Sequence, residues 1–138
     1  MISIVVDINQ FLSGFIYHGM MKLVFDLVLN NKLTLYVSSI LKEEVLEKLQ
    51  EYGISQQVQD EVMLFMERRG ILIEPTVKIL VCRDPEDNFV LELAETSQAN
   101  YLITRDKDLL VLPGKIWKDT KIMKPEDFLP LLRSYNLL

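Results

Sequence analysis

Two residue types that often carry chemistry are almost missing from this chain of 138 residues. It has one cysteine, Cys82, and one histidine, His18. A single thiol cannot form an internal disulfide, which fits a reducing cytoplasm, and Cys82 at the end of an apolar run is expected to be a small core residue. A lone histidine with no histidine or cysteine near it argues against a zinc site and against a His-based hydrolase triad.

Long apolar runs and an excess of positive charge are missing as well. No run approaches the length that crosses a bilayer, and the first residues lack a basic leader, so we expect no membrane anchor and no signal peptide. The formal net charge of −5 argues against holding nucleic acid by bulk positive charge. It does not argue against a nuclease, because bound divalent cations reverse the local sign of clustered carboxylates.

The chain is rich in short apolar runs that alternate with helical patterns. Hydrophobic residues make up 49% of it and charged residues 25%, which predicts one globular domain over residues 1–138. Strand-like runs lie at 2–6, 33–37, 71–73, 77–82 and 101–104, with a last strand near Trp117 and Ile122. Helical patterns lie at 10–30 (with a break near Gly14 or Gly19), 40–52, 55–69, 85–98 and 125–134. This alternation predicts an α/β fold, with three layers (α/β/α) around a central, mostly parallel sheet.

Acidic residues recur where these strands end. Asp7 follows the first strand, Asp106 follows the strand at 101–104, and Asp87 lies just after the run at 77–82. Glu44 lies early in the helix after the second strand, within the apolar stripe of that helix, where a carboxylate needs a partner. The carboxyl ends of parallel strands share one edge of a sheet, so we expect these four acids to converge there. Such a set of oxygen ligands suits Mg²⁺ or Mn²⁺.

Each acid also has a purely structural interpretation. Asp84 before Pro85 is a good helix cap, and Asp7 can cap the next helix. Asp106 can be an ordinary turn residue, and Glu44 can lie on a solvated helix face. These interpretations do not explain why acids follow several strands.

Four segments together resemble a PIN domain, in the branch of toxin components of toxin–antitoxin pairs. They are Asp-Ile-Asn at 7–9, residues 38–44, the stretch Arg-Asp-Pro-Glu-Asp-Asn at the start of 83–94, and Thr-Arg-Asp-Lys-Asp-Leu-Leu at 104–110. The resemblance implies a metal-dependent ribonuclease with a parallel sheet, in which a quartet of acids binds one or two Mg²⁺ or Mn²⁺ ions. By position the quartet is Asp7, Glu44, Asp87 and Asp106, while Asp84 matches a further acid of this branch and Asp108 an accessory one.

The supporting positions include two departures from the family pattern. Asn9 and Thr104 add neutral oxygens that can orient a ligand water or a carboxylate. Ile8 stands where the family usually has Thr, which removes a hydroxyl from the site. Arg105 stands where this branch often has Gly, and it could meet a phosphate.

The resulting hypothesis is metal-assisted hydrolysis of RNA phosphodiester bonds. Asp7, Asp87 and Asp106 hold a divalent cation, and Glu44 helps hold a second one or orients the attacking water. Basic residues near this edge either contact the RNA backbone or are ordinary solvated charges; they include Arg83, Arg105 and Lys107.

The resemblance further implies an RNA substrate, a small antitoxin partner and a homodimer. One alternative, motivated by Ile8, is a catalytically silent PIN-like module that binds an antitoxin or RNA. Another is a receiver-type phosphoacceptor domain, which Lys107 after Asp106 favours slightly.

Overall fold

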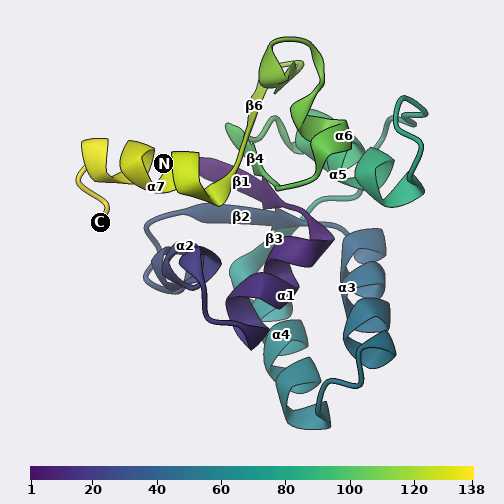
Figure 1. Ribbon diagram of the computed structural model, residues 1–138, viewed down its shortest axis with the longest axis vertical. Helices are drawn as coiled ribbons and strands as arrows, with labels where there is room; N and C mark the ends of the chain where they lie inside the picture. Colours follow the sequence, from purple (N-terminus) through teal and green to yellow (C-terminus); the bar gives the residue numbers. More distant parts are fainter.

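The computed structural model describes residues 1–138, and a six-stranded sheet forms its centre (Figure 1). The strands are β1 (Ser3–Val6), β2 (Thr34–Val37), β3 (Gly70–Leu72), β4 (Tyr101–Ile103), β5 (Ile116–Trp117) and β6 (Thr120–Met123). They lie in the order β3-β2-β1-β4-β6-β5, and all neighbours are parallel except the antiparallel pair β5–β6. Every residue of β1 and β4 is buried, as expected of central strands covered on both faces.

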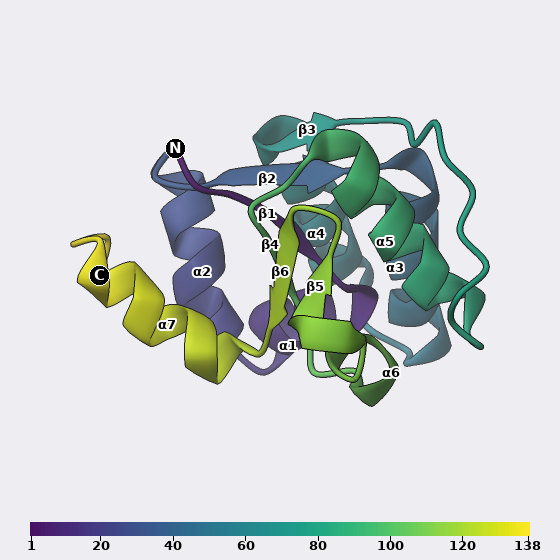
Figure 2. The same cartoon turned by 90° about the horizontal axis from the view of Figure 1, so that it is seen from above.

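Helices cover both faces of the sheet. They are α1 (Ile8–Ile16), α2 (Met20–Leu29), α3 (Ser39–Glu51), α4 (Gln56–Arg69), α5 (Pro85–Ser97), α6 (Lys107–Leu110) and α7 (Pro125–Ser134). In Figures 1 and 2, α1, α3 and α4 lie on one side of the sheet and α5 lies on the other, while α7 packs beside α2. This arrangement confirms the expected three-layer α/β/α fold with a mostly parallel sheet.

The helical pattern at 10–30 is two helices, α1 and α2, and the chain bends by 93° between them. Of the two expected break points, Gly19 is the correct one: His18 adopts a positive φ of 51° and Gly19 caps α2. Gly14 stays inside α1, where a Cβ atom would collide with the ring of Phe25. No single helix is long and apolar enough to cross a bilayer, although α1 and α2 together reach that length.

The expected strand at 77–82 is wrong, because this segment has no regular secondary structure. It has no neighbouring strand to pair with, and Leu80 and Val81 are 78% and 58% exposed. Its backbone N–H groups instead donate to side chains of α5. Thr76 N donates to Thr96 Oγ1 (3.2 Å), Ile79 N to Glu92 Oε2 (2.9 Å) and Cys82 N to Asn88 Oδ1 (2.8 Å). Each acceptor lies four residues before the previous one on α5, so the segment runs along one face of α5 toward the N-terminus of that helix.

Two smaller differences concern the second half of the chain. Residues 105–108 were expected to be a polar turn, but Lys107–Leu110 form α6, a one-turn helix that begins after Asp106. The last strand is a hairpin of β5 and β6, and β6 is the one that joins the parallel part of the sheet.

Candidate active site

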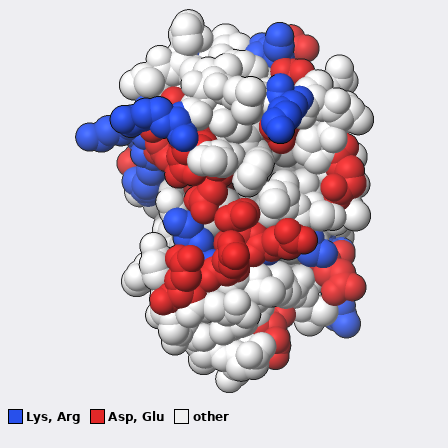
Figure 3. All heavy atoms as spheres, turned by 90° about the vertical axis from the view of Figure 1, so that its right-hand side faces the viewer, with Lys and Arg blue, Asp and Glu red and all other residues white.

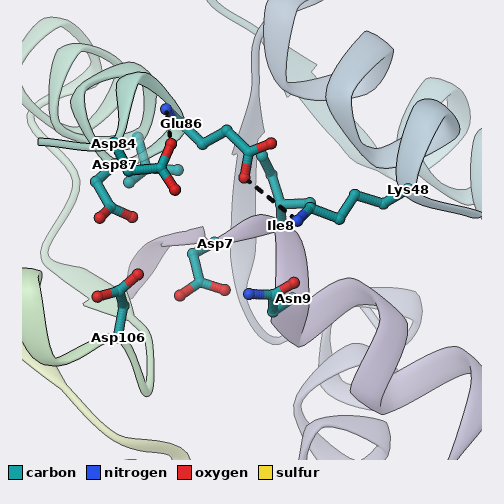
Figure 4. A pocket seen from close by; sticks show the side chains of 9 residues that line it. Asp7, Ile8, Asn9, Lys48, Asp84, Glu86, Asp87 and Asp106 are labelled. Carbon is teal, nitrogen blue, oxygen red and sulfur yellow. Dashed lines mark hydrogen bonds and ion pairs between the residues drawn. The ribbon is translucent and has the colours of Figure 1, made fainter. Parts of the chain in front are cut away.

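One pocket lies where the strand order reverses, at the carboxyl ends of β1 and β4. β1 continues into α1 on one side of this point, and β4 leads into α6 on the other, so both chain segments leave the sheet around a shared crevice. The residues that line it are Asp7, Ile8, Asn9, Lys48, Asp84, Glu86, Asp87, Val90 and Asp106 (Figure 4). Five of these nine side chains are acidic and one is basic, which makes the pocket strongly electronegative.

Asp7 is a buried acid at the end of β1, next to β4. It caps α1, accepting the N–H of Gln10 on Oδ1 (3.1 Å), and its Oδ2 accepts the hydroxyl of Thr104, 97 residues away. Burial raises the pKa of Asp7 to about 6, and the hydrogen bond from Thr104 opposes that rise. The Thr104 hydroxyl also accepts the N–H of Asp106 (2.9 Å), so Thr104 links two acids of the pocket.

Asp87 is the acid with an unused oxygen. It lies in the first turn of α5, is 5% exposed, and its Oδ2 is buried without any hydrogen-bond partner. Burial and then the Asp106 carboxylate raise the pKa of Asp87. Figure 4 shows the carboxylates of Asp7, Asp87 and Asp106 directed toward one another. A buried carboxylate oxygen with no donor calls for a cation or a proton.

The helix-cap interpretations hold for the same residues that form the pocket. Asp84 caps α5 and accepts the N–H of Glu86 (3.0 Å), and Asp106 caps α6 and accepts the N–H of Asp108 (2.8 Å). Capping uses one oxygen of each of these carboxylates. The interpretation as a cap and the interpretation as a site residue are therefore compatible.

Asn88 holds the turn that carries Asp84 and Asp87 to the pocket. Its side chain is buried, and its amide accepts from Cys82 N (2.8 Å) and donates to Cys82 O (3.1 Å). These two hydrogen bonds close the chain from residue 82 to residue 88 around the N-terminus of α5.

The residues present fit an oxygen-liganded divalent cation. Asp87, Asp106 and Asp108 can each offer one carboxylate oxygen within 4.8 Å of the others, and one oxygen of Asp87 is buried without a partner. The pocket has no histidine or cysteine, and hard cations such as Mg²⁺ and Mn²⁺ prefer carboxylate ligands.

Some predicted site residues lie beside the pocket. Glu44 does not line it; burial, and then the neighbouring Glu86 carboxylate, raise the pKa of Glu44. Thr104 is fully buried beneath the pocket, Asn9 lines it at the surface, and Asp108 is paired with Arg83 at 3.0 Å.

Two more of the predicted basic residues flank Asp106 in the sequence but do not line the pocket. Arg105 is exposed and pairs with Glu126 at 2.7 Å. Lys107 is exposed and forms no ion pair.

Sequence reasoning missed Lys48 and Glu86, which pair across the pocket wall at 3.7 Å. Lys48 lies four residues after Glu44 and so on the same face of α3, and Glu86 lies between Asp84 and Asp87. Helical spacing therefore offered a signal for Lys48. On the surface, acidic side chains gather in a band across the face that Figure 3 presents, which is the right-hand side of Figure 1.

Comparison with known proteins agrees with this geometry. The profile of a family described as PIN domain matches residues 3–108. The uncharacterized protein MJ1680 of Methanocaldococcus jannaschii is 33% identical over 117 residues, which cover 80% of this chain and 75% of that protein. Two crystal structures share the fold. VapBC2 from Rickettsia felis, bound to a DNA fragment from their promoter, has a TM-score of 0.64 at 16% identity and covers 89% of this chain and 98% of its own. PAE2754 from Pyrobaculum aerophilum has a TM-score of 0.55 at 17% identity and covers 96% and 90%.

Proposed function

This chain belongs to the PIN domain family, and on that premise we propose that it is a ribonuclease that hydrolyses RNA phosphodiester bonds with Mg²⁺ or Mn²⁺. The observation that carries the proposal is the buried, unpartnered Oδ2 of Asp87, a residue whose carboxylate is directed toward Asp7 and Asp106 in an acidic pocket. RNA is a polyanion, so such a pocket repels it unless cations neutralise the acids.

The roles of the residues follow from their positions. Asp87, Asp106 and Asp7 would hold the cation in the pocket that they line, and Asp108 lies close enough to Asp87 and Asp106 to contribute. When bound, a divalent cation lowers the pKa of a water molecule and polarises a phosphoryl oxygen. Thr104 keeps the Asp7 carboxylate turned toward the pocket. Glu44 does not line the pocket, so its effect on the site is indirect: its carboxylate neighbours that of Glu86, which does line the pocket.

Binding of the RNA backbone is assigned to two arginines that neighbour pocket acids in the sequence. Arg83 and Arg105 are both exposed and are each held by one acid, Asp108 and Glu126 respectively. A guanidinium that is fixed at one side retains donors for a phosphate on the other side.

Cleavage of single-stranded RNA tests this function. We expect cleavage with Mg²⁺ or Mn²⁺, its loss with chelator, and its loss in Asp7→Asn and Asp87→Asn. Asp60→Asn, at an exposed acid of α4 that bonds only to Gln56, is the matched control and keeps full activity. Cleavage that survives both pocket substitutions, or that ignores chelator, would refute the proposal.

A second candidate function is a catalytically silent module. Ile8 favours it, because this buried apolar side chain lines the pocket where a hydroxyl would serve a polar reaction better. Calorimetry with Mn²⁺ separates the two: a well-folded protein that binds no divalent cation supports the silent module.

We further propose that the partner is a small antitoxin with an acidic segment. An apolar groove lined by Phe15, Leu29, Leu64 and Phe65 lies between α1, α2 and α4. Its charged lining residues are Arg68, Arg69 and one acid, Glu61, so the net charge of the groove is positive and complements negative charge. Co-purification with a small protein encoded next to this one tests the pairing, and Leu64→Arg should abolish it. Light scattering on the purified protein tests the expected homodimer.

A further inference from the structure

Lys48 is the one basic residue in the pocket, and binding of a cation by Asp7, Asp87 and Asp106 gives it no role. It lies on α3, its side chain is 23% exposed, and its ammonium lies 3.7 Å from Glu86 Oε2. Figure 4 shows the side chain reaching from α3 to the pocket edge near Ile8 and Asn9, across the pocket from Asp106. Lysine is flexible and strongly hydrated, so a lysine kept mostly out of water has a defined position.

Two carboxylates from different helices lie near Lys48, and one of them, Glu86, lines the pocket. Glu86 comes from the first turn of α5 and pairs directly with Lys48, and Glu44 comes from α3, one turn before Lys48, with its carboxylate next to Glu86. The pocket therefore has an anionic wall at Asp87 and Asp106, and an opposite wall where a lysine already neutralises the nearest carboxylate.

A cation on the Lys48 wall would compete with the ammonium. Lys48 and a divalent ion near Glu86 and Glu44 would carry like charges a few ångströms apart, and this repulsion is strong in a partly desolvated site. The second ion could bind only by displacing Lys48 from Glu86.

We propose that Lys48 takes the place of a second metal ion, so that the site binds one divalent cation at the Asp87–Asp106 wall and uses the Lys48 ammonium as its second positive charge. This inference rests on the proposed function. The ammonium is positioned to contact a phosphate oxygen of RNA in the pocket and to stabilise the negative charge that develops there. The Lys48 ammonium thus replaces the second ion that Glu44 was expected to help hold, if it did not orient the attacking water instead.

Counting bound ions tests the inference without measuring activity. We expect the wild-type protein to bind one Mn²⁺ per chain in calorimetry and electron paramagnetic resonance. Lys48→Met should bind a second ion, because Glu86 then loses its counter-ion and lies beside the Glu44 carboxylate. Lys42→Met is the matched control, since Lys42 lies on the same helix, outside the pocket and without an ion pair, and it should bind one ion.

The outcomes separate this inference from the proposed function. Two ions in the wild-type protein, or one ion with unchanged affinity in Lys48→Met, would overturn the role of Lys48 and leave a metal-dependent ribonuclease standing. No ion in any of the three proteins would overturn the metal-dependent function itself.

A kinetic experiment gives a second test. Lys48→Met should lower kcat by about 100-fold, as the loss of one preorganised charge does, and Lys48→Arg should recover part of the lost kcat. A kcat in Lys48→Met equal to that of Lys42→Met would also overturn the inference.

Discussion

Asn88 binds both polar groups of the Cys82 backbone with the two ends of its amide, at 2.8 Å and 3.1 Å. In a sheet, a neighbouring strand pairs with the backbone N–H and C=O groups. Here the Asn88 amide takes that role for an irregular segment, because it pairs with an N–H and a C=O at once. It also fixes the chain just ahead of Asp84 and Asp87, which links folding of this segment to the geometry of the site.

Replacing Asn88 is expected to affect stability and metal binding together. Asn88→Ala leaves the Cys82 backbone groups unpaired and should lower the free energy of unfolding by about 1–3 kcal/mol in urea titrations. It should also weaken Mn²⁺ binding, since Asp84 and Asp87 are less well placed. Asn30→Ala, at an exposed asparagine whose side chain makes no hydrogen bond, is the control. Unchanged Mn²⁺ affinity in Asn88→Ala would show that the clamp is only structural.

Thr104 is expected to control the proton affinity of Asp7. Thr104→Val removes the hydroxyl that donates to the Asp7 carboxylate, so the charged form loses a hydrogen bond and the pKa of Asp7 should rise above about 6. Carboxyl chemical shifts followed by NMR against pH measure this directly. Thr120→Val is the control, because Thr120 is equally buried but donates to Ala99 O, away from the pocket. A pKa of Asp7 that is the same in both variants would contradict the assigned role.

Stability without metal should fall as pH rises from about 4 to about 7. The pKa of Asp7 is raised in the folded protein to about 6, and that of Asp87 is also raised, so the folded state binds more protons than the unfolded state in this range. For Asp7 alone the shift corresponds to a loss of about 3 kcal/mol. Urea unfolding with chelator at pH 4.5 and pH 7.5 measures it, and Asp7→Asn should reduce the slope. Stability that rises over this range would contradict the assigned shifts.

Gly14 should not tolerate a larger residue. A Cβ atom at this position would overlap the Phe25 ring and lie 3.2 Å from Met21 Cβ, so Gly14→Ala forces α1 and α2 apart. We expect a loss of about 1–3 kcal/mol in the free energy of unfolding, typical of overpacking. Gly19→Ala is the comparison, because a Cβ there meets only Ser13 Oγ at 3.8 Å. If Gly19→Ala loses as much as Gly14→Ala, the cause is not the contact with Phe25.

The positions of Asp7 and Asp106 followed from sequence because a simple rule governs them. Residues after parallel strands share one edge of the sheet, whatever the details of packing. Asp87 also arrived at this edge although the strand expected before it is absent, because α5 begins there. The N-terminus of the helix, rather than a strand, places this carboxylate.

Glu44 and the segment at 77–82 show where local patterns stop being informative. The helical wheel places Glu44 on the face of α3 that turns toward the pocket. Which residue of that face lines the pocket depends on the path of α3 past it, and that residue is Lys48. The apolar pattern at 77–82 is typical of a strand. Its actual partners are polar side chains of α5, 6 and 13 residues away, and no local pattern reveals them.

The central place of β1 has a consequence for the order of folding. β1 lies between β2 and β4, and Asp7 receives its hydrogen bond from Thr104, 97 positions later in the chain. Four of the five acids that line the pocket also come from the second half of the chain, after residue 83. The first half alone therefore leaves Asp7 without its hydroxyl partner and without the other acids, so the pocket forms only when both halves of the chain have come together.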